Sequence, residues 1–162
     1  MTGSIDWLAW AVWGFGATAV LTVILAAGQG LGLTRLSIPY VLGSMVTLDR
    51  DRARLYGIAL HFVSGWAFSF MYVLGFHVWG GPTWWKGAVF GALHGAFVLG
   101  VLLPALPAVH PRMASESRGP TVVRQLEPPG FLGLHYGTRT PASAFVAHVV
   151  FGAILGAGYL AA

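Results

Sequence analysis

The stretch that decides the fold runs from Trp84 to Pro104 and reads WWKGAVFGALHGAFVLGVLLP. It is almost wholly apolar and long enough to cross a bilayer as one helix, which takes about 20 residues. One ionisable side chain, His94, stands in its middle. Ionisable groups at membrane depth are costly, and they usually mark a functional site. The stretch therefore predicts a membrane-spanning helix in which His94 has a special role.

Small residues recur along this stretch at intervals of four, and they are Gly87, Gly91, Gly95, Ala88, Ala92 and Ala96. Small residues at this spacing let the backbones of neighbouring membrane helices approach closely. His94 lies seven residues after Gly87 and three after Gly91, so it shares the glycine face. We therefore expect His94 to point at a partner helix and not at lipid.

The composition of the whole chain agrees with a membrane protein. Of its 162 residues 56% are hydrophobic and 9% are charged, and the mean hydropathy is +0.72. A soluble domain carries roughly 25% charged residues. The chain has no cysteine, which excludes disulfides and thiolate metal sites. The net charge of +4 does not indicate nucleic-acid binding, because the basic residues lie in the segments that flank the apolar stretches.

Four segments meet the length and apolarity of a spanning helix. We expect helices at residues 5–27, 55–76, 84–104 and 141–160, joined by long connectors at 28–54 and 105–140. Pro104 and Pro107 are expected to end the third helix, because proline cannot continue one. The sequence thus predicts an all-α, integral membrane four-helix bundle, with residues 1–162 forming a single transmembrane domain.

The two long connectors are expected to contain ordered parts. Residues 33–48 are apolar but interrupted by Pro39, so they predict a short broken helix in the membrane interface. The connector at 105–140 is rich in proline and glycine, and loops of this length are uncommon unless they are functional or disordered. Its last third is apolar, so we expect it to pack on the bundle through Phe131, Leu132, Leu134 and Tyr136.

The basic residues predict the orientation of the chain in the membrane. The two long connectors carry eight arginines, Arg35, Arg50, Arg52, Arg54, Arg112, Arg118, Arg124 and Arg139, whereas the opposite side has only Lys86. Loops rich in Lys and Arg face the cytoplasm. We therefore expect a bacterial-type inner (plasma) membrane protein whose two termini are periplasmic or extracellular.

A histidine-glycine-tyrosine pattern occurs twice, as His61, Gly65 and Tyr72 and as His148, Gly152 and Tyr159. Offsets of four and eleven residues place each trio on one helix face. Both helices start on the same side, so the two histidines are expected about 10 Å deep, with His94 at roughly 15 Å on the antiparallel helix. The repeated pattern either arose by chance or reflects the duplication of a helical hairpin.

The three histidines have a structural interpretation and a ligand-binding one. In the first, each hydrogen-bonds across helices to a nearby hydroxyl such as Ser64, Ser69 or Ser143. In the second they are metal ligands, which imidazole serves more often than any other side chain. One version is a b-type haem held by His61 and His148, with Gly65, Gly95 and Gly152 leaving room for the macrocycle. The other is a three-histidine site for zinc, copper or iron, formed by His61, His94 and His148.

Other function classes fit the sequence less well. The interior of the spans carries no Asp, Glu, Arg or Lys, whereas proton-coupled transporters usually need an intramembrane carboxylate. No serine has the neighbours that a hydrolase needs. The sequence therefore favours a His-lined intramembrane pocket with a redox or electron-transfer role. The alternative is a non-catalytic accessory subunit that docks on a larger membrane complex or forms homo-oligomers.

Overall fold

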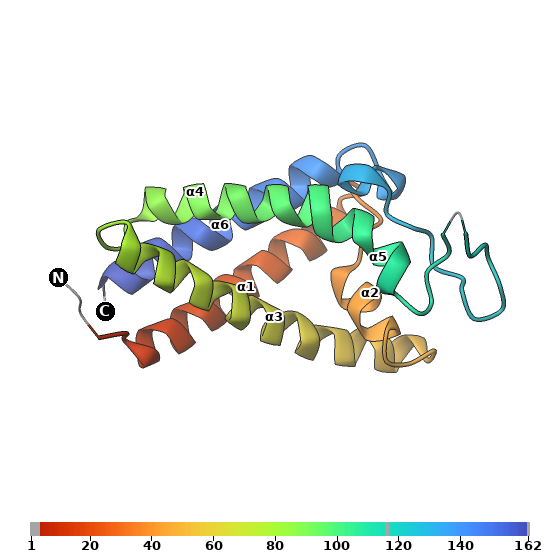
Figure 1. Ribbon diagram of the computed structural model, residues 1–162, viewed down its shortest axis with the longest axis horizontal. Coiled ribbons are helices and arrows are strands. Elements are labelled where there is room, and N and C mark those ends of the chain that lie inside the picture. Colours follow the sequence, from red (N-terminus) through yellow and green to blue (C-terminus); the bar gives the residue numbers. More distant parts are fainter. Residues whose placement is uncertain (1–3, 116, 162) are drawn as a thin grey trace.

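The computed structural model describes residues 4–115 and 117–161, and this part of the chain is helical, with no strands. Its long helices are α1 (Trp7–Gly30), α3 (Arg50–Val78), α4 (Trp84–Phe97) and α6 (Thr140–Ala161) (Figure 1). The helix that begins as α4 continues through η1 (Val98–Leu102) and α5 (Leu103–Val109). Within the described residues, four helices are long and apolar enough to cross a membrane. The prediction of an all-α chain with four such helices is therefore confirmed.

Large apolar side chains are exposed along all four long helices, among them Leu8, Val23, Val63, Leu93 and Val146. In water such a surface would be an aggregation liability. The exposed apolar surface is consistent with a multi-pass membrane protein, because such side chains can face lipid tails, which are as apolar as leucine. For the same reason, helices in lipid gain no hydrophobic free energy when they come into contact. In a bilayer, the contacts between these helices would therefore have to come from close packing and polar bonds.

The start of α3 lies further toward the N-terminus than the sequence predicted. The Asp49 side chain accepts hydrogen bonds from the backbone N–H groups of Asp51 and Arg52, at 3.0 and 2.9 Å. An aspartate in this position stabilises the first turn of a helix. Residues 50–54, expected to lie in the first connector, therefore belong to the helix.

The prediction that Pro104 and Pro107 end the third helix is wrong, because the helix continues to Val109. A proline inside an α-helix clashes with the carbonyl four residues earlier and lacks a backbone donor. Here η1 is a π-helical turn in which the N–H of Leu103 bonds the carbonyl of Val98, five residues before it. The wider turn admits the proline ring, so the helix is adjusted and not broken.

A short helix, α2 (Ile38–Ser44), lies in the first connector, where the sequence predicted one. It packs on the beginning of α3 through two glycines, with the Cα of Gly43 against the carbonyl of Ala53 and the Cα of Gly57 against the carbonyl of Pro39. A side chain at either glycine would collide with backbone atoms. The two helices therefore meet backbone to backbone.

The core has two parts. One lies between α1, α3 and α6 and contains Ala17, Leu21, Tyr72, Phe76, Ala147, Phe151 and Leu155. The other lies beside the long connectors and contains Leu36, Val41, Leu99, Leu103, Met113, Tyr136 and Ala144. The expectation that the last third of the second connector packs on the bundle holds for Tyr136 and Leu132. Phe131 and Leu134 are exposed.

Tyr136 gives the fold a predicted pH dependence. Its hydroxyl donates a hydrogen bond to the Glu127 carbonyl, and burial, aided by the Glu127 carboxylate, raises the pKa of Tyr136 to about 12. An unfolded tyrosine ionises near pH 10. The stabilisation is therefore complete below about pH 10 and is lost as the pH rises toward 12.

We expect the purified protein to lose resistance to unfolding by SDS between about pH 9 and about pH 11.5. The Tyr136→Phe variant has no phenol proton to lose, so its resistance should fall less over the same interval. Equal losses in the two proteins would show that Tyr136 is not responsible.

The long helices are packed unequally. α4 and α6 are in the closest contact, α1 packs on both α3 and α6, and α3 and α4 meet mainly through aromatic side chains. Near the two ends of the described chain, the N–H of Asp6 donates to the hydroxyl of Tyr159 at 3.0 Å. The start of α1 and the end of α6 thus lie together at one end of the bundle, and the two long connectors lie at the other (Figure 1).

Candidate functional site

The glycine face of α4 positions the candidate site. The Cα atoms of Gly87 and Gly91 lie against the backbone of α6 at Gly152 and His148. This close approach brings the His94 and His148 rings together, with centroids 4.7 Å apart and planes at 79°. The prediction that His94 points at a partner helix is confirmed, and the partner is α6.

His148 is buried and held in one orientation. Its Nδ1 donates a hydrogen bond to the carbonyl of Ala144 at 2.7 Å. A carbonyl can only accept, so Nδ1 carries the proton. In a neutral imidazole the other nitrogen, Nε2, then has a free lone pair.

His94 is held by aromatic neighbours. Its Nδ1 shares a hydrogen bond with the hydroxyl of Tyr72 at 3.1 Å, and either group can be the donor. The ring of Phe68 lies over the imidazole, with centroids 4.1 Å apart. Nε2 takes no part in the bond to Tyr72, so it is the nitrogen left for a further partner.

His61 carries a polar atom that the surrounding protein does not satisfy. Its Nε2 is fully buried and has no hydrogen-bond partner among the described residues. A buried polar nitrogen without a partner is uncommon and points to a bound water, ion or ligand.

The structure brings two of the three predicted ligands into contact and leaves the third beside them. Within residues 4–115 and 117–161, no three His, Asp or Glu side chains are already arranged around one point as a metal site. His94 and His148 form the pair. His61 would have to come nearer to this pair to complete a triad.

The three glycines predicted to leave room for a haem lie at helix contacts. A Cβ on Gly65 would meet the side chain of Thr18, and one on Gly152 would meet the carbonyl of Gly87. A Cβ on Gly95 would lie 3.2 Å from the Cβ of His148. The space beside each glycine is therefore taken up by another part of the protein.

A groove of about 400 Å³ between α3 and α4 reaches His94. It is lined by Phe68, Met71, Tyr72, Phe90, Leu93, His94 and Phe97. The sequence interpretation missed Phe90 and Phe97, although both share a helix face with His94 at offsets of four and three residues. Tyr72 and His94 supply the polar end of a groove that is otherwise apolar.

The two histidine-glycine-tyrosine trios make partly similar contacts. Gly65 packs on α1 and Gly152 packs on α4, which in each case is the preceding long helix. The tyrosines differ, because Tyr72 bonds His94 whereas Tyr159 bonds the backbone of Asp6. A duplication of helical hairpins stays a prediction.

Two of the three serines suggested as partners, Ser64 and Ser69, bond elsewhere. Ser64 donates to the carbonyl of Leu60, and Ser69 joins the indole N–H of Trp10 to the carbonyl of Trp66. Polar contacts of the histidines come instead from Ala144 and Tyr72.

The comparisons with known proteins return no match to a protein-family model, to a curated protein or to a solved structure. Any function assigned to this chain therefore rests on its own residues.

Proposed function

We propose that this chain is a small multi-pass membrane protein that binds a transition-metal ion between α3, α4 and α6. His94 and His148 would be the first two ligands, and His61 the third. The observation that carries the proposal is the contact of the His94 and His148 rings, each with its Nδ1 already engaged.

The spacing of the two rings suits shared ligation. With metal–nitrogen bonds of about 2.1 Å, two imidazoles on one tetrahedral ion have centroids about 5 Å apart. The centroids of His94 and His148 are 4.7 Å apart. Small side-chain movements would therefore be enough to place one ion between them.

The hydrogen bonds around the histidines also suit ligation. A metal-binding histidine almost always gives its other ring N–H to a carbonyl, a carboxylate or water, which fixes the ring. The Ala144 carbonyl does this for His148, and the Tyr72 hydroxyl can do it for His94. Ligation of His61 would also satisfy its buried Nε2.

A single ion fits better than a haem. A macrocycle between His61 and His148 would need the space above Gly65, Gly95 and Gly152, where neighbouring helices lie. Imidazole ligands suit zinc, copper and iron, and cysteine is absent from the chain. A redox or electron-transfer role requires copper or iron, because zinc does not change its oxidation state.

The distribution of arginines supports an orientation for this protein. Both long connectors and the first turns of α3 lie at one end of the bundle and carry the arginines, whereas α4, with Lys86 in its first turn, begins at the end where α1 begins and α6 finishes (Figure 1). By the positive-inside rule, the connectors would face the cytoplasm of a bacterial-type inner membrane. The ends of the described chain would then be periplasmic or extracellular.

The test is the metal content of the purified protein. We expect about one copper, iron or zinc ion per chain by elemental analysis, and a loss of about tenfold or more in affinity for either His94→Ala or His148→Ala, since ligand loss costs at least this much. His77→Ala is the matched control, because His77 lies on α3 away from the cluster and bonds the Val73 carbonyl. The control should keep its metal.

Two outcomes would overturn metal binding. One is a wild-type protein that binds no copper, iron or zinc after exposure to each ion in turn. The other is equal metal content in His94→Ala, His148→Ala and His77→Ala. A strong absorption band of bound haem that disappears in His61→Ala and His148→Ala would favour the haem alternative.

The groove between α3 and α4 favours a second candidate function, that of an accessory subunit. Its apolar wall could receive a membrane-spanning helix of a larger complex, with Phe68, Leu93 and Phe97 in contact. A colourless, metal-free protein that co-purifies with larger membrane subunits would support this function. Loss of those subunits in Leu93→Trp, which fills the groove, would identify the contact surface.

A further inference from the structure

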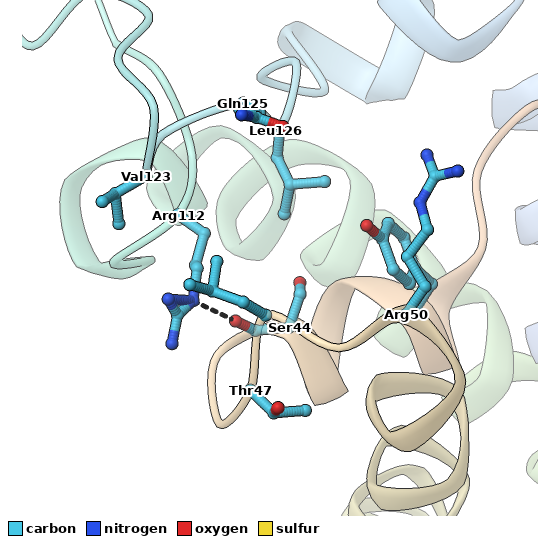
Figure 2. A pocket seen from close by; sticks show the side chains of 9 residues that line it. Ser44, Thr47, Arg50, Arg112, Val123, Gln125 and Leu126 are labelled. Atoms are coloured by element: carbon cyan, nitrogen blue, oxygen red, sulfur yellow. Dashed lines mark hydrogen bonds between the residues drawn. The ribbon is translucent and has the colours of Figure 1, made fainter.

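A second hollow lies at the connector end of the bundle, well away from the histidine cluster. Its volume is about 340 Å³, and its walls come from α2, the first turn of α3 and the second connector (Figure 2). The lining residues are Tyr40, Ser44, Thr47, Leu48, Arg50, Arg112, Val123, Gln125 and Leu126. Three separate segments of the chain thus form one pocket.

The wall formed by the second connector is fixed to the end of α2. His110 is buried, and its Nε2 donates to the carbonyl of Val41 at 2.9 Å. The Nε of Arg112 donates to the carbonyl of Ser44 at 3.0 Å, as Figure 2 shows. These bonds satisfy carbonyls that a helix end leaves unpaired.

Backbone hydrogen bonds close the connector behind the pocket. The N–H of Leu126 bonds the carbonyl of Arg112, and the N–H of Ala114 bonds the carbonyl of Leu126, both at 3.0 Å. Val123, Gln125 and Leu126 are thereby held over α2. The pocket is therefore bounded by anchored segments on each side.

The pocket is positively charged. Arg50 and Arg112 line it on opposite sides of Ser44 (Figure 2), and no Asp or Glu is among the lining residues. The ion pairs found in the described part of the chain join Arg35 to Glu127 and Arg54 to Asp51. The two acids next to Arg50 in sequence have other partners, because Asp49 accepts bonds from the first turn of α3 and Asp51 pairs with Arg54.

The guanidinium groups keep donors available for a ligand. Arg112 uses Nε for Ser44, which leaves the four N–H groups on its two terminal nitrogens. Arg50 lies with its guanidinium carbon 6.0 Å from the centroid of the Tyr40 ring. Figure 2 shows the two guanidinium groups directed to opposite sides of Ser44, so a phosphate held by both requires the exposed Arg50 side chain to turn toward Arg112. Guanidinium groups are suited to the oxygen atoms of phosphate.

Apolar residues on the rim indicate where such a phosphate would come from. Leu48 and Val123 belong to the lining, and 64% and 49% of their surfaces are exposed. Their neighbours Val46 and Val122 are exposed as well. A small inorganic anion would make no contact with these apolar side chains, whereas the acyl chains of a phospholipid would cover them.

We propose that this pocket binds a phosphate group, and that an anionic phospholipid carries it. The phosphate binds the terminal N–H groups of Arg112, the exposed Arg50 side chain turns to meet it, and the acyl chains lie along Leu48 and Val123. Basic pockets beside membrane helices bind lipid headgroups in this way. The site is independent of the histidine cluster and of any metal bound there.

The test compares thermal unfolding of the full chain in mixed micelles of phosphatidylcholine with and without phosphatidylglycerol. Phosphatidylglycerol should raise the unfolding temperature in a saturable way, whereas inorganic phosphate alone should not. Arg50→Gln and Arg112→Gln should each weaken the apparent affinity by about tenfold, the loss expected for one charge-assisted hydrogen bond. Arg124→Gln, in the same connector but outside the lining, is the matched control.

Arg50→Gln is the more informative variant, because none of the hydrogen bonds described for this chain joins the Arg50 side chain to another group. Saturable stabilisation by inorganic phosphate, lost in the same two variants, would keep the phosphate site but overturn the lipid as its source. Equal stabilisation by both micelles, or equal affinity in Arg50→Gln and Arg124→Gln, would overturn the proposal altogether.

Discussion

Replacing Gly152 by alanine should separate α4 from α6 and cost the protein much of its stability. A Cβ on Gly152 would overlap the carbonyl of Gly87 and would lie 2.9 Å from the backbone nitrogen of Gly91. Overpacking typically costs about 1–3 kcal/mol when side chains can move aside. Here the blocking atoms are backbone, so the two helices must move apart, and we expect about 3 kcal/mol or more.

The matched control for this substitution is Gly16→Ala on α1. Apart from the backbone of α1 itself, no atom lies within 4 Å of the position where its Cβ would be, so the added methyl group would collide with no neighbouring helix. Unfolding of both variants by SDS, followed by circular dichroism, gives the comparison. Gly152→Ala should also bind less metal, because the same contact sets the distance between His94 and His148. Equal stability of Gly152→Ala and Gly16→Ala would mean that this contact is not needed for folding.

Substitution of His110 by phenylalanine should release the second connector. The phenyl ring is similar in size but cannot bond the Val41 carbonyl, the Ser44 hydroxyl or the N–H of Arg112. A buried polar group left without a partner costs roughly 1–3 kcal/mol, and here several would be affected. The connector should therefore open locally while the four long helices stay folded.

Limited digestion with trypsin measures this opening, since the enzyme cleaves after Arg112, Arg118 and Arg124 when the chain can enter its active site. We expect cleavage in this connector to be at least about tenfold faster in His110→Phe, as a loss of 1.4 kcal/mol implies. His135→Ala is the control, because that side chain is exposed and bonds only the nearby Pro128 carbonyl. Unchanged cleavage in His110→Phe would show that the bonds of His110 do not hold the connector.

Much of the helical pattern follows from local properties of the chain. Apolar runs of spanning length predicted the long helices, and the ends of α6 differ from the predicted ones by a single residue on each side. The larger errors in the predicted helix ends occur where a hydrogen bond or a change in helix geometry moves the end of a helix. Asp49 starts α3 early, and the π-helical turn before Pro104 lets the third helix continue. The spacing of apolar residues predicts neither the hydrogen bonds of Asp49 nor the π-helical turn.

The candidate site was predictable in part. The glycine spacing around His94 placed it on a packing face, and the contact with His148 agrees with that placement. The Tyr72 hydroxyl on His94 and the unpartnered Nε2 of His61 depend on rotamers and on the separation of α3 from α4. The pocket with Arg50 and Arg112 was missed, because its two arginines are 62 positions apart in the chain and line one pocket only because α2 lies between them.

Residue composition and local patterns were enough to predict a helical chain, four helices of spanning length, and arginines gathered between the apolar runs. These properties depend on residue type and on short periods, which act within one or two helical turns. Tertiary structure alone decided which glycines let backbones touch, which histidines meet, and how His110 and Arg112 bind the end of α2. Those outcomes depend on how close distant segments come, and in this bundle a single methyl group at Gly152 is enough to change that distance.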